Sequence, residues 1–120
     1  MRGRKRQSIK IPKEEWKLGY IAGLIDGEGA ISTYKVRTTR DGVQPRIQIY
    51  NSDKKIMDFL LKEVGGKCYY VQSSRSAFSK RMIYQWQLSS RADIATLLRH
   101  ILPYLIVKRE KAEEVLKLCE

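Results

Sequence analysis

Hydrophobic residues recur along this chain with two different periodicities, in segments that follow one another. Apolar residues three or four positions apart, the spacing of one helix face, mark four segments. Alternation of apolar and polar residues, the spacing of a half-buried strand, marks residues 44–51 and 81–89 clearly and 30–39 loosely, and residues 67–74 are rich in the strand-forming Tyr and Val. The pattern predicts helices over residues 13–26, 53–64, 91–101 and 107–118, and strands over residues 30–39, 44–51, 67–74 and 81–89.

Proline, glycine and aspartate separate these segments. Pro12 stands near the first turn of the first helix, where a missing N–H costs little, and Gly27 and Gly29 are expected to end that helix. Asp41-Gly42 predicts a hairpin turn between the first two strands. Asp53 is a suitable N-cap for the second helix.

Hairpins interleaved with helices predict an α+β protein. The order is αββαββα followed by one more helix, which favours an antiparallel sheet with the helices on one face. One sheet face should therefore be apolar and the other open. By alternation, the open face is expected to carry Ser32, Tyr34, Gln44, Arg46, Gln48, Tyr50, Gln72, Gln85 and Gln87.

The charge balance suggests a partner for that open face. The chain has 120 residues, with 24 Lys or Arg against 13 Asp or Glu and a formal net charge of +11. This length fits one domain, so we expect a basic arm over residues 1–12 and a single domain over 13–120. The positive excess lies in the arm and between residues 29 and 91. Such a basic chain favours nucleic acid as partner; a soluble basic protein without that partner is the alternative.

The same composition excludes several classes of protein. The longest apolar stretch, near residues 18–25, is far shorter than the roughly 20 residues of a membrane span. The charged start has no apolar segment after it, as a secretory signal would. Cys68, Cys119 and the single His100 are too few for a four-ligand zinc site. We expect an intracellular, reduced protein that does not enter membranes.

Three glycines share one face of the first helix. Gly19, Gly23 and Gly27 follow one another at intervals of four residues. Each interior glycine lowers helix stability by about 0.5–1 kcal/mol relative to alanine, a cost that a closely approaching backbone would offset. The face either packs against the protein's own sheet or meets the same helix of a second copy across a two-fold axis.

Two acidic residues lie at the end of the same helix, where the helix dipole disfavours negative charge. They are Asp26 and Glu28. Pairing of two such helices would bring two Glu28 carboxylates together. A divalent cation would relieve both problems, because hard cations bind carboxylate and carbonyl oxygens. A solvated acidic helix end is the alternative.

Residues 21–29, Ile-Ala-Gly-Leu-Ile-Asp-Gly-Glu-Gly, resemble the motif that names the LAGLIDADG homing endonucleases. They differ from it at the first, seventh and eighth letters. Asn51-Ser52-Asp53 and the segment 102–108 also resemble recurring segments of that family. The resemblance covers about residues 13–118, and it implies the αββαββα fold of the family.

The resemblance implies roles for single residues. Glu28 matches the acidic metal ligand, and the Gly27 carbonyl matches the backbone ligand beside it. Asn51 falls where the family positions water, and Lys108 falls on a basic residue that supports the hydrolytic centre; by themselves they would be a helix-flanking residue and a solvated charge. The implied ion is Mg²⁺, with Mn²⁺ or Ca²⁺ able to take its place. The implied dimer interface comprises Gly19, Ala22, Gly23 and Asp26.

The implied function is site-specific hydrolysis of double-stranded DNA by metal-activated water. One motif per chain supplies one half-site, so the resemblance implies a homodimer on a long pseudo-palindromic target, serving the homing of an intron or intein. The polar sheet face would lie in the major groove, with phosphate contacts from basic loops and the arm. The alternative is a non-cleaving nucleic-acid-binding protein, such as an intron RNA maturase or a transcriptional regulator. Neither acts on a small-molecule substrate.

Overall fold

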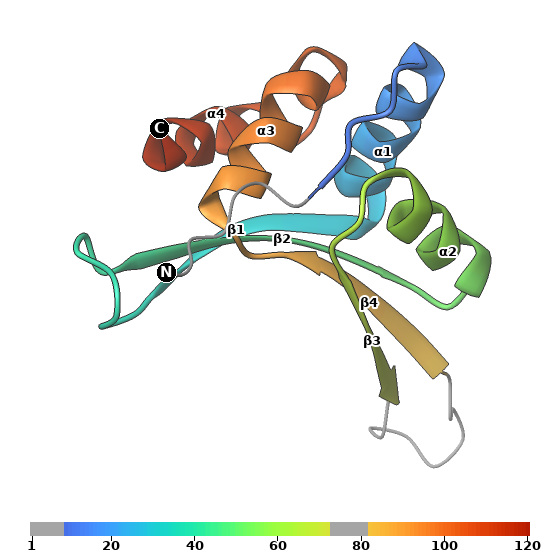
Figure 1. The fold of residues 1–120 in the computed structure, drawn as a ribbon, viewed down its shortest axis with the longest axis horizontal. Helices are drawn as coiled ribbons and strands as arrows, with labels where there is room; N and C mark the ends of the chain where they lie inside the picture. Colours follow the sequence, from blue (N-terminus) through green and yellow to red (C-terminus); the bar gives the residue numbers. More distant parts are fainter. Residues whose placement is uncertain (1–8, 73–81) are drawn as a thin grey trace.

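The computed structural model describes residues 9–72 and 82–120. Its elements confirm the predicted α+β class and the αββαββα order with a further helix (Figure 1). The chain between the predicted strands 67–74 and 81–89, with the end of the first and the start of the second, lies outside the described residues. The elements are α1 (Glu15–Glu28), β1 (Gly29–Lys35), β2 (Val43–Asn51), α2 (Lys54–Glu63), β3 (Lys67–Gln72), β4 (Met82–Leu88), α3 (Arg91–Ile101), the 3-10 helix η1 (Leu102–Tyr104) and α4 (Arg109–Cys119).

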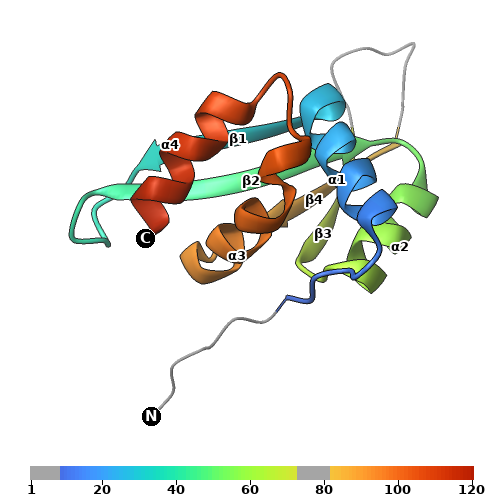
Figure 2. The ribbon, with the colours of Figure 1, turned by 90° about the horizontal axis from the view of Figure 1, so that it is seen from above.

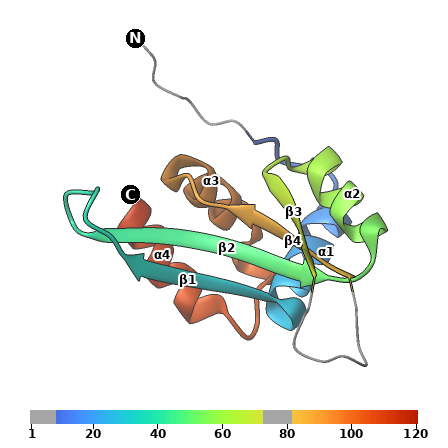
Figure 3. The same ribbon diagram turned by 90° about the horizontal axis from the view of Figure 1, so that it is seen from below.

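The four strands form one antiparallel sheet in the order β1-β2-β4-β3. All four α-helices lie on one face of this sheet and leave the other face without a covering helix (Figures 1 and 3). Seen from above, α4 lies over β1, and α2 lies beside β3 and β4 (Figure 2). The one-sided arrangement predicted from the alternation of residues is confirmed.

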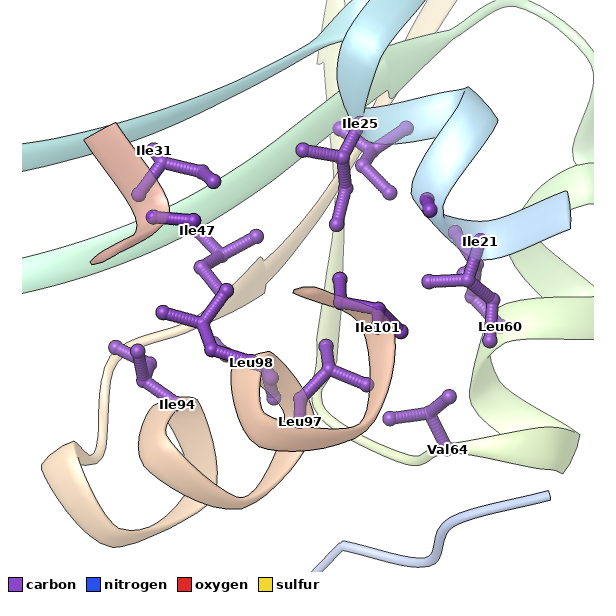
Figure 4. Packing of buried hydrophobic residues seen from close by; sticks show 14 of the residues in the cluster. Ile21, Ile25, Ile31, Ile47, Leu60, Val64, Ile94, Leu97, Leu98 and Ile101 are labelled. Atoms are coloured by element: carbon purple, nitrogen blue, oxygen red, sulfur yellow. The ribbon is translucent and has the colours of Figure 1, made fainter. Parts of the chain in front are cut away.

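The core lies between the sheet and the helices. Ile47, Ile49 and Trp86 are fully buried on the covered face of the sheet. Branched aliphatic side chains of α1 and α3 close over them, among them Ile25 and Leu98 (Figure 4). Each such side chain contributes about 1.5–3 kcal/mol when it is removed from water. This core fixes the position of α1 on the sheet.

The first helix is shifted along the chain from its predicted position. It starts at Glu15 after the N-cap Glu14, so Pro12 lies outside its first turn. It also continues through Gly27 and ends at Glu28. The helix ends before Gly29, whose backbone lies close against β2. A Cβ at this position would lie 2.7 Å from the Gln48 carbonyl oxygen, so only glycine fits. This close approach allows α1 to lead directly into β1.

The last four residues of the predicted basic arm, 9–12, pack against the domain. Ile9 is only 7% exposed and belongs to the core cluster. The neighbouring Lys10 donates its backbone N–H to the Val64 carbonyl at 2.8 Å. Residues 9–12 therefore pack against the domain, and the arm before residue 9 lies outside the described residues.

The remaining boundaries follow local chemistry. Asp53 caps α2 as predicted by accepting from the backbone N–H of Lys55 at 2.9 Å. Pro103 lies inside the short turn η1, between α3 and α4. The last helix starts at Arg109 because the preceding residues are held in a loop. Among the described residues, no helix is both long and apolar enough to cross a membrane.

Candidate active site and nucleic-acid interface

The end of α1 brings two of the predicted catalytic residues together. Glu28 is the last residue of α1, and Asn51 is the last residue of β2. The Asn51 side-chain amide donates to the Glu28 carboxylate, and its oxygen accepts the backbone N–H of Asp53 at 2.8 Å. Asn51 thus orients the Glu28 carboxylate, while its own orientation is fixed by the start of α2. Both side chains line an open depression of about 230 Å³.

The third predicted catalytic residue, Lys108, reaches the same helix end from the other side. Its ammonium group donates to the Asp26 carbonyl oxygen at 2.8 Å. Its backbone N–H donates to the Asp26 carboxylate at 3.0 Å, and that of Ile106 does so at 2.8 Å. The loop before α4 is therefore bound to the motif helix. The Lys108 ammonium group places a positive charge at the carbonyl of Asp26, a residue two positions before Glu28.

These contacts settle the charge of Asp26. Partial burial opposes ionisation of this carboxyl, but the N–H groups of Ile106 and Lys108 and the charge of Lys108 outweigh it and lower the pKa of Asp26. Asp26 therefore remains an anion and binds its own chain. Its predicted place in a dimer interface stays a prediction.

The glycine face of α1 does not pack against the protein's own sheet. A Cβ built at Gly19, Gly23 or Gly27 would meet no atom within 4 Å among the described residues. The first interpretation of these glycines is therefore wrong for the single chain. The face is instead a groove of about 400 Å³ that Glu28 also lines.

Ala22 does not share this open face, and its predicted place in a dimer interface stays a prediction. It is fully buried. Ala22 follows Leu18 by four residues and precedes Ile25 by three, which is the spacing of the core face of α1. Its small size serves the packing of the helix on the sheet.

The pairing of the strands places most of the predicted contact residues on the uncovered face. Ser32 lies opposite Arg46 and Tyr34 opposite Gln44. The same parity holds across β2 and β4. The residues on this face include Ser32, Tyr34, Gln44, Arg46, Gln48, Tyr50, Gln85 and Gln87. Whether they contact DNA stays a prediction.

Gln72 is a predicted contact residue whose side chain lies outside the described residues. By register it pairs with Met82, and its predicted place on this face stays a prediction. Lys67 and Tyr69, opposite Gln87 and Gln85, take uncovered positions of β3 that the prediction did not include.

The sequence could not place β3 by alternation. Lys67-Cys68-Tyr69-Tyr70-Val71-Gln72 has no regular exchange of apolar and polar residues. Pairing with Gln85 and Gln87 of β4 is the signal that assigns Lys67 and Tyr69 to the uncovered face. Both side chains are exposed there.

The donor set at Glu28 fits a hard divalent cation only in part. Glu28 is exposed and has no ion-pair partner among the described residues. No cluster of three or more His, Cys, Asp or Glu side chains occurs within 9–72 and 82–120. The oxygens that one chain offers are the Glu28 carboxylate, the Asn51 amide oxygen and nearby carbonyls. A divalent ion there would need further oxygens from water, from phosphate or from a second copy.

Comparison with known proteins identifies the fold. No protein-family model matches the sequence, and no curated protein matches it. Solved structures do match. The homing endonuclease I-CvuI, in complex with the I-CreI target, aligns with a TM-score of 0.68 and 20% identity over 88% of this chain and 66% of its own. The archaeal intron-encoded homing endonuclease I-Vdi141I, complexed with DNA, gives 0.66 and 20% over 89% and 69%.

A third match connects the fold to the motif in α1. The I-SmaMI LAGLIDADG homing endonuclease, bound to cleaved DNA, aligns with a TM-score of 0.64 and 17% identity over 98% of this chain and 39% of its own. The chain thus has the fold of the LAGLIDADG homing endonucleases, as the motif implied. It spans just under two thirds of the I-CvuI chain and a smaller part of I-SmaMI.

Proposed function

We propose that this protein is a LAGLIDADG homing endonuclease of the single-motif type, which cuts double-stranded DNA at a specific long site. The observation that carries the proposal is the position of Glu28. Its carboxylate has no ion-pair partner among the described residues, lies at the end of the glycine-lined helix, is oriented by Asn51 and lies next to the uncovered polar face of the sheet. Catalytic and recognition surfaces therefore meet at one edge of the fold.

DNA binding follows from the uncovered face and the charge. The antiparallel strands β1 and β2 form a ribbon whose uncovered side chains include Arg46, Gln48 and Tyr50. The major groove of B-DNA, about 12 Å wide, admits such a two-stranded ribbon, and Arg and Gln side chains pair with base edges there. The net charge of +11 favours the phosphate backbone. One chain would read one half-site.

A second copy of the chain would complete the enzyme. The groove along Gly19, Gly23 and Gly27 is open and reaches Glu28. Beside the same helix end, Ile106 and Val107 are 84% and 73% exposed. A protein contact that covered these apolar side chains would be favoured by their removal from water. Pairing of the two grooves across a two-fold axis would bring one Glu28 from each chain toward the two strands of a pseudo-palindromic site.

The chain's own residues support metal-assisted hydrolysis. Glu28 and the Gly27 carbonyl would hold a divalent ion, Mg²⁺ in the cell, with Mn²⁺ or Ca²⁺ as substitutes. Bound there, such an ion activates water and stabilises the leaving oxygen. Asn51 holds the Glu28 carboxylate in place and can position water through its amide. Lys108 adds a positive charge near the phosphate that is to be cut.

Selection from a randomised duplex library tests this function. We expect the full chain with Mg²⁺ to enrich cleaved duplexes that share one long, near-palindromic sequence, as the homing of an intron or intein requires. With Ca²⁺ in place of Mg²⁺, the same sequence should be retained by binding. Retention of a sequence that is never cut in Mg²⁺ or Mn²⁺ would favour the non-cleaving alternative, a maturase or a regulator on the same scaffold.

A further inference from the structure

The uncovered face of the sheet carries a contact that the register alone does not predict. The Tyr34 ring lies over the guanidinium of Arg46, with 4.2 Å between Cζ and the ring centroid. The Tyr34 hydroxyl extends on toward Gln48 and donates to its Oε1 at 3.4 Å. Tyr34 therefore lies along the sheet, over its neighbours on β2, and does not stand out from it.

Polar groups are buried beneath and beside this ring. The Oγ of Ser32 and the Nε of Arg46 are both buried and have no hydrogen-bond partner among the described residues. Gln48 is only 7% exposed although no helix covers its face. Its amide donates to Gln87 at 3.4 Å. The Gln48 side chain and the Nε of Arg46 are thus covered by the protein's own side chains, although Arg46 as a whole is partly exposed.

Two opposing effects act on this covered arrangement. A guanidinium stacked on an aromatic face is attracted by the ring, which holds Arg46 under Tyr34. A buried donor without an acceptor is costly, so the Nε of Arg46 and the hydroxyl of Ser32 destabilise the same arrangement. A ligand that supplies acceptors to Arg46 would shift this balance toward an uncovered state.

We propose that Tyr34 is a positioning residue that stacks on Arg46 in the free protein and turns away when Arg46 pairs with a base edge. This inference rests on the proposed function of the sheet as the DNA-binding face. Only a base pair that offers good acceptors to Arg46 compensates for the lost stack, whereas random sequence leaves Tyr34 in place. The cost of breaking the stack therefore lowers affinity for the selected site and leaves random binding nearly unchanged.

The free protein gives the first test. Protons attached to Cδ of an arginine stacked on a tyrosine resonate upfield because of the ring current. We expect this upfield shift for Arg46 in the full-length protein, its retention in Tyr34→Phe, which keeps the ring, and its loss in Tyr34→Leu. A chemical shift of Arg46 that does not change in Tyr34→Leu would overturn the proposal, whatever the protein does with DNA.

DNA binding gives the second test, with the duplex that the wild type selects and a random duplex of equal length. Tyr34→Leu should raise the affinity for the selected duplex by about three- to tenfold and that for the random duplex much less, so the ratio of selected to random affinity rises. In an Arg46→Ala background the same substitution should change the ratio little, because the covered group is gone. Tyr50→Leu, an exposed tyrosine on the same face, is the matched control, and its effect should multiply with that of Arg46→Ala.

The outcomes separate this inference from the proposed function. Wild-type protein that binds no duplex would refute both. A wild type that binds and cuts its site, with an unchanged ratio in Tyr34→Leu, would refute the role of Tyr34 alone. If the fold-change in the affinity ratio of the double variant equals the product of the fold-changes of Tyr34→Leu and Arg46→Ala, the role of Tyr34 is refuted as well.

Discussion

Lys108, in the loop before α4, contacts Asp26, near the end of α1, although 82 residues separate the two in the sequence. Asp26 accepts two backbone N–H groups through its carboxylate, and its own carbonyl accepts the ammonium group. Three hydrogen bonds therefore fix the loop before α4 on the end of the motif helix. The position of Lys108 relative to Glu28 depends on this contact.

Replacing Asp26 should loosen that contact. Asp26→Asn keeps the shape but can accept only one of the two N–H groups without strain, so we expect stability to fall by about 1–3 kcal/mol. Urea denaturation checks the stability. Cleavage should fall further than binding, because Lys108 loses its fixed position. A variant that cuts as fast as the wild type would show that this loop is not part of the catalytic centre.

Acid should weaken a second contact, at the far end of the sheet. Arg91 donates to both carboxylate oxygens of Asp41, at 2.8 and 3.0 Å, and to the Val43 carbonyl. The Arg91 guanidinium lowers the pKa of Asp41 below its ordinary value of 3.8. The unfolded chain therefore binds this proton first, so the stabilisation is complete above pH 3.8 and is lost as pH falls through the folded pKa.

The variant Arg91→Met tests this pH dependence. It should reduce stability at pH 7 while making the loss of stability below pH 4 shallower than in the wild type. Thermal unfolding followed across pH 2.5–7 measures both effects. The contact anchors the β1–β2 hairpin. If stability falls equally steeply below pH 4 in the two proteins, Asp41 does not cause the loss of stability in acid.

The glycines of the motif helix should separate into two kinds. Gly23→Ala places a methyl group in open space, so the single chain should gain about 0.5–1 kcal/mol from better helix propensity. Gly29→Ala places one 2.7 Å from the Gln48 carbonyl oxygen and should lose about 1–3 kcal/mol. Denaturation at a concentration that keeps the protein monomeric compares the pair.

A larger group at the same open position should act on assembly. Gly23→Leu would insert a side chain into the groove from both copies of a symmetric dimer, while the core of each chain stays intact. We expect the dimer to weaken and cleavage to fall with it. Light scattering over a concentration series, together with cleavage rates, measures this. A Gly23→Leu protein that remains dimeric and active would place the interface elsewhere.

Base recognition should depend on Arg46. Arg46→Ala should lose about 1–3 kcal/mol against the preferred base and relax the selected sequence at one position of each half-site. Selection from the randomised library with the variant measures the change position by position. An unchanged site with uniformly weaker binding would mean that Arg46 contacts phosphate.

The sequence predicted those parts of the molecule that depend on spacing. Alternation placed Arg46 and Gln85 on the same face, since the parity of a strand is fixed by its backbone. It missed Lys67 and Tyr69, because β3 has no alternation to follow and only pairing with β4 sets their face. It also ended the first helix too early, at residue 26, because Gly27 is tolerated inside α1 while the close approach at Gly29 ends it.

The site was predicted less completely than the fold. The motif located Glu28, and the segment beginning at Asn51 located its neighbour, but their hydrogen bond depends on how α1 leads into the sheet. The stack of Tyr34 on Arg46 depends on side-chain direction along the strand, which periodicity does not encode. Ala22 was assigned to the interface by the resemblance alone, whereas its spacing from Leu18 and Ile25 assigns it to the core face of α1.

The most direct test of the central claim compares wild-type protein with Glu28→Gln on the selected duplex in Mg²⁺. The substitution keeps the size of the side chain and removes the charge that would bind the metal. We expect fold and duplex affinity to be retained, measured by circular dichroism and gel shift, and strand cleavage to be abolished. Cleavage by Glu28→Gln at the wild-type rate would contradict the assignment of Glu28 as the metal ligand and, with it, the proposed active site.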